Sequence, residues 1–182
     1  TYAMTDFRPF PKVPRWSRDI IVTEKLDGTN ASIYIGDAGE FLVGSRTRWI
    51  TPGKQTDNYG FAAWAHDNKN DLLNLGPGHH FGEWWGKGIQ RGYGLDERRF
   101  SLFNVSRWNE GRPACCHVVP TLYNGENLSD AVGAALAVLT TLGSRAVSGF
   151  MDPEGIIVYH TASGTAYKKT CKNDETPKSL LQ

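Results

Sequence analysis

The sequence DIIVTEKLDGTNASIYI, residues 19–35, decides how this chain begins to fold. Its two apolar runs, Ile20–Glu24 and Ser32–Ile35, are rich in β-branched residues or alternate in polarity, as strands do. Asp27-Gly28 between them is a pair that favours a tight turn. A third short strand is predicted over Phe41–Ser45. We therefore expect a meander of three antiparallel strands here and no βαβ unit.

The rest of the chain continues this mixture of strands and helices. Apolar side chains at helical spacing predict two helices, Tyr59–Leu75 and Leu128–Leu142. We expect Asn127 or Ser129 to cap the second helix and Gly143 to end it. The further predicted strands are His79–Trp85, Phe100–Val105, Gly155–Tyr159 and Thr165–Lys169, of which the last two form a closing hairpin. A glycine-rich, basic loop at 86–99 joins the first two. The predicted class is α+β, with mostly antiparallel sheets and a few helices.

Length and composition limit the kinds of protein that this chain can be. Its 182 residues predict one domain, 1–182, with an extended segment at 1–17 and a polar tail at 173–182. A formal net charge of +1 excludes nucleic-acid binding through bulk charge but leaves a local basic patch open. Three cysteines with no CxxC pair predict reduced thiols in a cytoplasmic protein. We expect no signal peptide and no membrane span.

Lys25 stands at a strand end, directly before the turn and between the acidic residues Glu24 and Asp27. An isolated lysine of this kind is usually part of a solvated, charged turn. Further segments on strands or at strand ends change this interpretation: Gly44-Ser45-Arg46, Gly82-Glu83, FSLFNV at 100–105, Pro153-Glu154-Gly155 and Ala166-Tyr167-Lys168-Lys169. In this order they resemble the motif series of the covalent nucleotidyltransferases, which include RNA ligases, ATP-dependent DNA ligases and mRNA capping enzymes. The resemblance is closest to short phage-type RNA ligases with a KxxGxN element, and it covers about residues 20–172.

The resemblance implies a nucleotidyltransferase core, of the ATP-grasp-like type found in ligases, and a role for each matched residue. Lys25 matches the lysine that attacks the α-phosphate of a nucleotide. Glu83 matches the carboxylate that holds the ribose, Phe103 the ring that stacks on the base, and Glu154 the carboxylate near the metal. Asn30 and Arg46 match residues near the RNA end. The full set implied for the nucleotide is Glu24, Arg46, Glu83, Phe103, Lys168 and Lys169, with Lys168 on the α-phosphate.

The function implied is that of an ATP-dependent RNA ligase that passes through a covalent lysyl-AMP, joins a 5′-phosphate to a 3′-hydroxyl and serves RNA repair. Its cofactors would be ATP and Mg²⁺ or Mn²⁺. Its partners would be RNA ends, and a nicked duplex stays open as a substrate; no membrane partner is expected. Phosphoryl transfer needs positive charge on the non-bridging oxygens, and magnesium prefers carboxylates with water and phosphate oxygens. Two alternatives stay open: a stand-alone adenylyltransferase with a non-RNA acceptor, and a non-catalytic module that binds nucleic-acid ends.

Several residues depart from the family pattern or lie outside it. Thr170 stands where the last motif usually has its second lysine, and Asn104 stands where relatives often carry aspartate, which we interpret as structural. The chain is expected to lack the accessory domain that many ligases append. Trp84 and Trp85 should point to opposite faces of their strand. The loop cations, interpreted as solvated or as phosphate contacts, are Lys87, Arg91, Arg98 and Arg99.

Overall fold

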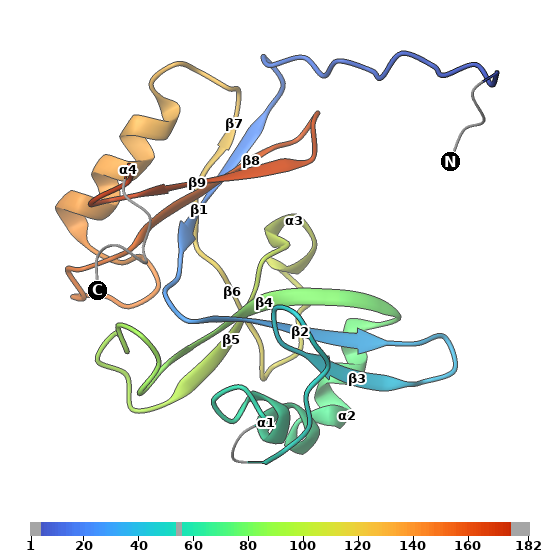
Figure 1. Cartoon of the computed structure of the whole chain (residues 1–182). Coiled ribbons are helices and arrows are strands. Elements are labelled where there is room, and N and C mark those ends of the chain that lie inside the picture. Colours follow the sequence, from blue (N-terminus) through green and yellow to red (C-terminus); the bar gives the residue numbers. More distant parts are fainter. Residues whose placement is uncertain (1–4, 54–55, 176–182) are drawn as a thin grey trace.

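A computed structural model describes residues 5–53 and 56–175. The part it describes contains two β-sheets that lie one above the other in Figure 1, with helices on their outer sides. The mixed, mainly antiparallel architecture confirms the predicted fold class. No helix in residues 5–53 and 56–175 combines the length and the apolar character needed to cross a membrane.

The four-stranded sheet has the order β7-β1-β8-β9, and all its neighbours are antiparallel. Its strands are β1 (Ile20–Lys25), β7 (Thr121–Gly125), β8 (Gly155–His160) and β9 (Thr165–Thr170). The five-stranded sheet has the order β3-β2-β4-β5-β6, in which only β5 and β6 run parallel. Its strands are β2 (Thr29–Ile35), β3 (Phe41–Gly44), β4 (Gly78–Gly86), β5 (Arg98–Leu102) and β6 (His117–Val118).

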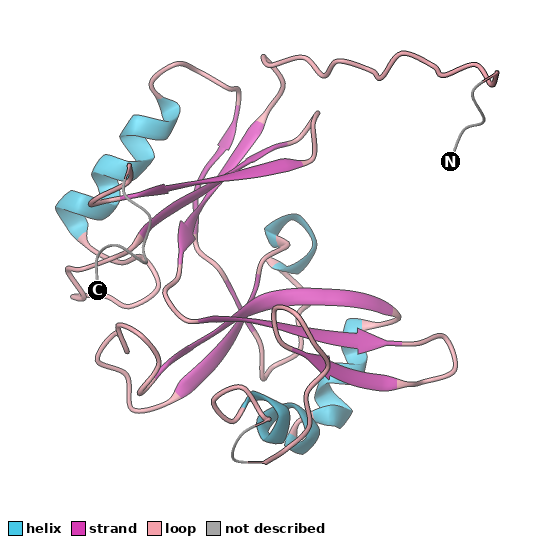
Figure 2. Ribbon diagram, in the orientation of Figure 1, coloured by secondary structure: helices cyan, strands magenta, loops and turns pink. Residues whose placement is uncertain are grey.

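Most helices cover the outer faces of the two sheets, as Figure 2 shows, whereas one short helix lies between them. α4 (Ala131–Leu142) packs on the four-stranded sheet, where its Ala135 and Leu139 join the apolar side chains of β1 and β8. α1 (Phe61–Asp67), α2 (Lys69–Leu72) and the 3₁₀ helix η1 (Leu73–Leu75) lie against the five-stranded sheet. The short α3 (Val105–Trp108) follows β5. Each sheet therefore buries one face under helices and turns the other toward the second sheet.

The predicted meander of the first three strands is wrong, because β1 and β2 belong to different sheets. β2 and β3 do form a hairpin, but β1 pairs with β7 and β8 instead. Residues 26–28 carry the chain from one sheet to the other, and this passage is tightly packed. A Cβ on Gly28 would lie 2.3 Å from the backbone oxygen of Trp84, so only glycine fits there. The Asp-Gly pair thus marks a crossing between sheets and not a hairpin turn.

The helix predicted over Tyr59–Leu75 is divided into three short pieces. Asn68, between α1 and α2, has φ −106° and ψ 15°, outside the α region. Its side-chain Nδ2 donates to the Trp64 backbone oxygen at 2.8 Å and satisfies a carbonyl at the end of α1. An asparagine whose side chain bonds locally in this way competes with continuation of the helix. The apolar spacing therefore predicted helical structure correctly, but the prediction of one continuous helix is wrong.

Three other expectations about the elements need correction. The strand predicted over Phe100–Val105 ends at Leu102, because the Asn104 side chain accepts from Arg107 N and begins α3. α4 begins at Ala131 with neither predicted cap, since Asn127 donates to the backbone oxygen of Trp16. It ends at Gly143, as predicted. The sequence did not predict β6 and β7, because Pro120 interrupts the apolar residues between them. The pairing of β7 with β1 has a register shift beside this proline.

The described part of the N-terminal segment, residues 5–19, contains no helix or strand, and Figure 1 shows it leading away from the sheets. It is attached at Trp16, whose ring stacks on His160 with the centroids 5.4 Å apart. His160 also lies within hydrogen-bond distance of the Trp16 backbone oxygen, at 3.0 Å. Residues 1–4 of the predicted extended segment and 176–182 of the predicted polar tail lie outside the described residues.

Candidate active site

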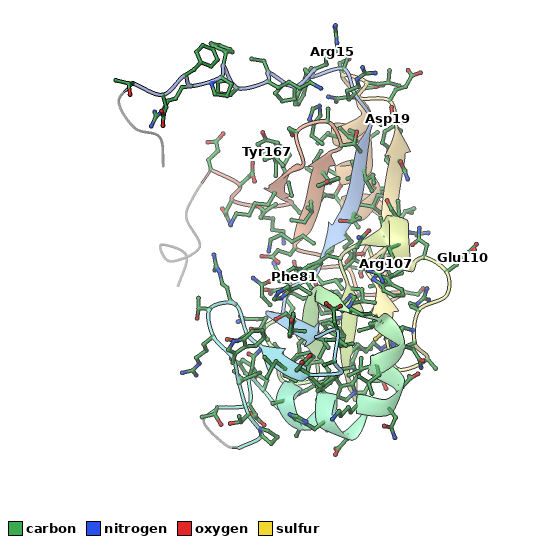
Figure 3. The ribbon with its side chains drawn as sticks, turned by 90° about the vertical axis from the view of Figure 1, so that its right-hand side faces the viewer. Arg15, Asp19, Phe81, Arg107, Glu110 and Tyr167 are labelled. Atoms are coloured by element: carbon green, nitrogen blue, oxygen red, sulfur yellow. The ribbon has the colours of Figure 1, made fainter. Side chains whose placement is uncertain are left out.

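A cleft of about 750 Å³ opens between the two sheets. β1, β8 and β9 line one side, β2 and β4 line the other, and α3 with the residue before it closes one end. Among the predicted site residues, the cleft brings together Glu24, Lys25, Asn30, Glu83 and Phe103. Figure 3 shows Phe81 and Arg107, two further lining residues, at the level where the sheets meet.

Lys25 lines the cleft and forms an ion pair with Glu154. Lys25 is the last residue of β1 and is in register with Gly155, the first residue of β8, so the pairing of these strands places Glu154 beside it. Lys25 Nζ lies 2.8 Å from Glu154 Oε2. The Glu154 side chain is only 8% exposed, whereas Lys25 keeps 24% of its side chain accessible. The amine is therefore held by a buried carboxylate and still reachable from the cleft.

Glu83 and Asn30 face Lys25 from the other sheet. They are direct partners in the register of β2 and β4, so both side chains project to the cleft face. Glu83 Oε2 accepts a hydrogen bond of 2.9 Å from the backbone N–H of Gly28. Burial raises the pKa of Glu83 to about 7, and the negative charges of Glu154 and Asp27 add to the rise, while Gly28 and Lys25 oppose it. This carboxyl group therefore titrates near neutral pH.

The turn after Lys25 is fixed by side chains from the glycine-rich loop. The backbone N–H of Asp27 donates to the Tyr93 hydroxyl at 2.8 Å, and the Asp27 carboxylate pairs with Arg91 at 2.6 Å. Arg91 Nε also lies 3.4 Å from the Asp152 carboxylate, just before Glu154 in the chain. One loop thus ties the lysine turn to the glutamate segment. Arg91 was noted only as one of four loop cations, and Tyr93 gave no signal in the sequence.

Strand alternation divides the predicted nucleotide-binding residues between two faces. Lys168 is in register with Ile157, a residue that lines the cleft, so Lys168 lies on the cleft face of β9. Lys169 is in register with Ile156, which packs under α4, so it lies on the opposite face. Lys169 Nζ is 3.6 Å from the carboxylate of Asp174.

Glu24 lies in the cleft wall, but its carboxylate points to the helix side of the sheet. It accepts hydrogen bonds from Ser144 Oγ at 2.7 Å and from the backbone N–H groups of Arg145 at 2.6 Å and Ala146 at 3.2 Å. Burial raises its pKa, and these hydrogen bonds oppose the rise. The carboxylate of Glu24 therefore anchors the loop after α4.

Arg46 lies apart from the cleft, in a neighbouring hollow of about 600 Å³. This hollow is bordered by the loop after β3 and by residues 57–59, and Arg48 lines it as well. Asn58 joins the hollow to the cleft wall, because its side-chain amide donates to the Asn30 backbone oxygen at 3.2 Å. The two residues predicted for the RNA end, Asn30 and Arg46, thus lie in adjacent hollows.

Both faces of β4 are covered at its C-terminal half, which explains the two tryptophans. Trp84 points to the helix side and contacts Phe61, and Trp85 points between the sheets and contacts Tyr93. Both are at most 2% exposed, so the predicted opposite directions are right but neither ring reaches the solvent. The sequence missed several lining residues: His79, Phe81, Arg107, Ile157 and Tyr159. For the four on strands, alternate spacing along β4 and β8 is the signal that would have identified them, whereas Arg107 lies on the short helix α3.

The donor set of the cleft fits a hard divalent cation. Glu83 and Glu154 are close enough for their charges to interact, and both are carboxylates with little exposure. Within residues 5–53 and 56–175, no three side chains of histidine, cysteine, aspartate or glutamate cluster to hold a metal. A cation here would therefore complete its shell with water and phosphate oxygens, as magnesium does in nucleotide-dependent enzymes.

Comparison with known proteins gives a consistent result. A family model described as RNA ligase matches residues 18–172. Comparison with curated proteins gives no match. An apo mutant of Naegleria gruberi RNA ligase is similar with a TM-score of 0.60 and 20% identity, over 85% of this chain and 50% of that chain. A mutant of the same ligase with ATP and Mn gives 0.60 and 21% identity, over 84% and 48%. These structures share the fold, and this chain spans about half their length.

Proposed function

This chain belongs to the RNA ligase family, and on that premise we propose that it is an ATP-dependent ligase that joins RNA ends through a lysyl-AMP on Lys25. The observation that carries the proposal is the position of Lys25. Its side chain lines a cleft between two sheets, with the amine 2.8 Å from the buried Glu154 carboxylate. A lysine at this point is accessible to a nucleotide, and carboxylates for a metal stand beside it.

In the first step, Lys25 Nζ attacks the α-phosphorus of ATP. A lysine side chain is ordinarily an ammonium at neutral pH, so the nitrogen must leave Glu154 and pass a proton to solvent water before its electron pair is free. A phosphorus–nitrogen bond forms, the bond to the bridging oxygen of the β-phosphate breaks, and pyrophosphate leaves with that electron pair. Lys168, on the cleft face of β9, is suited to neutralise charge on the α-phosphate.

In the second step, a 5′-phosphate oxygen of RNA attacks the same phosphorus and displaces the Lys25 amine, which takes up a proton. In the third, a 3′-hydroxyl oxygen attacks the 5′-phosphorus of the adenylylated RNA and passes its proton to solvent. A phosphodiester bond forms, the bond to the AMP oxygen breaks, and AMP leaves. Glu83 and Phe103 are assigned to the ribose and the base, because both line the cleft on the side opposite Lys25. Bound Mg²⁺ or Mn²⁺, for which Glu154 is the candidate ligand, would supply positive charge to the phosphate oxygens.

The test is incubation with α-labelled ATP and magnesium, followed by denaturing electrophoresis and a sealing assay with 5′-phosphorylated RNA. Lys25→Arg is expected to lose the label, because a guanidinium stays protonated and cannot attack. Lys69→Arg, on the outer helix α2, is the matched control and should keep the label. A labelled Lys25→Arg protein would contradict the assignment. Labelling of the wild type without sealing of any RNA end would instead favour an adenylyltransferase with another acceptor.

A further inference from the structure

Four aromatic rings form a continuous surface beside the cleft, which we call the aromatic platform: Tyr34, Trp49, His79 and Phe81. Phe81 and His79 alternate along β4, and Tyr34 is in register with His79 on β2. Trp49 reaches the group from the loop after β3, where it bridges to Gly44. His79 and Phe81 also line the cleft, so the platform begins within it and extends away from Lys25.

The rings stand close together in related orientations. The His79 and Phe81 rings are 6.0 Å apart with 7° between their planes, and the Trp49 and His79 rings are 6.4 Å apart with 18°. Tyr34 leans on His79 at 4.6 Å. Three of the four rings are therefore nearly parallel. Because each side chain is braced by its neighbours, the surface is formed before any ligand arrives.

The platform is not part of the hydrophobic core. Phe81 is 58% exposed and Trp49 is 53% exposed, whereas the other face of this sheet buries Ile33 and Phe100 completely. Exposed rings that gather on one face of a sheet, with solvent over them, are typical of a binding surface. In RNA-binding domains, aromatic side chains on a sheet face stack two or three unpaired bases.

Charge on the surrounding surface favours a polyanion as the occupant. Arg46 and Arg48 lie on the same loop as Trp49 and are exposed at the edge of the neighbouring hollow. Arg107 borders the cleft at the other end, where its guanidinium stacks on Trp108. Rings flanked by arginines match a single strand, in which bases stack on the rings while phosphates contact the guanidinium groups.

We propose that the aromatic platform binds unpaired RNA bases next to the end to be joined, so that the preferred substrate is a single-stranded RNA end. This inference rests on the proposed ligase function and specifies its substrate. Residues on the cleft side of β4 recur every ~6.7 Å, a spacing that suits successive bases of an extended strand. Bases inside a continuous duplex are stacked on one another and cannot cover these rings.

The test measures binding of a fluorescein-labelled ten-nucleotide single-stranded RNA by anisotropy at fixed salt, with the same RNA annealed into a nicked duplex as comparison. Trp49→Leu and Phe81→Leu are each expected to weaken binding of the single strand at least about fivefold. Trp49→Phe, which keeps a ring, should recover most of the affinity. Tyr167→Ala changes an exposed ring on β9, in the other sheet (Figure 3), and serves as the matched control.

Wild-type affinity in both leucine variants, or equally tight binding of the nicked duplex, would overturn the platform proposal. Concentration-dependent self-association that Trp49→Leu abolishes, with RNA binding unchanged, would assign the face to a second copy of the chain. Circular dichroism of each variant shows whether it is folded. Labelling with ATP is measured on the same preparations. Loss of RNA binding with normal labelling in Trp49→Leu, whose ring is not among the cleft-lining residues, supports the platform. Unchanged RNA binding in that variant refutes the platform alone, and absence of labelling in the wild type refutes the proposed function.

Discussion

Lys25 Nζ and Glu154 Oε2 lie 2.8 Å apart, although the two residues are separated by 129 positions in the chain. The pair joins the nucleophile proposed for adenylylation to the carboxylate proposed for the metal. Breaking the pair leaves the buried Glu154 carboxylate without its partner, so both members act as one unit. In the proposed mechanism, the Glu154 carboxylate pairs with the Lys25 amine before the reaction and is the candidate ligand of the cation during it.

We expect Glu154→Gln to reduce the rate of self-adenylylation at least about a hundredfold, or ~2.7 kcal/mol in the barrier. The amide keeps the shape of the side chain but loses the charge that a divalent cation requires. Single-turnover labelling with ATP over a range of magnesium concentrations measures this. EDTA should abolish labelling of the wild type. A variant with the wild-type rate and magnesium dependence would show that the metal is bound elsewhere.

The crossing at Gly28 makes a second prediction, on stability. Gly28→Ala places a Cβ 2.3 Å from Trp84 O and 2.7 Å from Trp85 Cβ, both of which belong to the buried β4. Overpacking of this kind costs ~1–3 kcal/mol or more in the free energy of unfolding. Gly133→Ala is the matched control, because no atom lies within 4 Å of its Cβ position in α4. That substitution should stabilise the protein by roughly 0.5–1 kcal/mol. Urea unfolding measures both, and equal effects would refute the packing argument.

The sequence predicted most strands correctly but not which sheet each one joins. Side-chain alternation reports which face of a strand is buried, and it carries no information about the neighbouring strand. β1 therefore looked like the first strand of a meander, although its partners β7 and β8 come about a hundred or more residues later.

For the candidate site too, the sequence identified residues but not the face of the sheet on which each side chain lies. The motif series predicted Lys25, Asn30, Glu83 and Phe103 as site residues, and all four line one cleft. It did not reveal that Glu24 anchors the loop after α4 or that Lys169 lies on the helix face, because both facts depend on strand register. Tyr93 and Arg91 hold the lysine turn through contacts more than sixty residues apart, which no local pattern encodes.

Glu83 makes a prediction about pH. Its pKa rises from 4.5 to about 7 on folding, so it favours the folded state below pH 4.5, and this contribution is lost as the pH increases through about 7. Glu83→Gln does not titrate, and its stability relative to the wild type should increase by on the order of 3 kcal/mol between about pH 4.5 and pH 8.5. Denaturant unfolding at several pH values measures this. A constant difference across the range would show that Glu83 has an ordinary pKa.

Phe103 makes a prediction about nucleotide binding. Its side chain is 41% exposed and lies across the cleft from Ile157, and both residues line the pocket. Phe103→Ala is expected to weaken ATP binding by ~1–3 kcal/mol, the range for one base stack, and Phe103→Leu should recover only part of it. Calorimetric titration with a non-hydrolysable ATP analogue provides the measurement. Unchanged affinity in Phe103→Ala would move the stacking role to another ring of the cleft, with Phe81 the next to test.

The last prediction separates joining from adenylylation. Asn30 stands opposite Glu83 on the cleft face, and Asn58 donates to its backbone oxygen. Its side chain therefore lines the cleft outside the Lys25–Glu154 ion pair. An amide is neutral and can both donate and accept, which suits a ribose hydroxyl at an RNA end. We expect Asn30→Ala to slow the sealing of 5′-adenylylated RNA at least about tenfold, or 1.4 kcal/mol, and to affect self-adenylylation much less. Arg46→Ala should weaken sealing and, in part, adenylylation, because a guanidinium in the adjacent hollow can contact phosphate. Single-turnover sealing of a pre-adenylylated strand, with and without a complementary template, measures both variants. If Asn30→Ala seals at the wild-type rate, the role of the residue is structural, and the strand end is held by other groups.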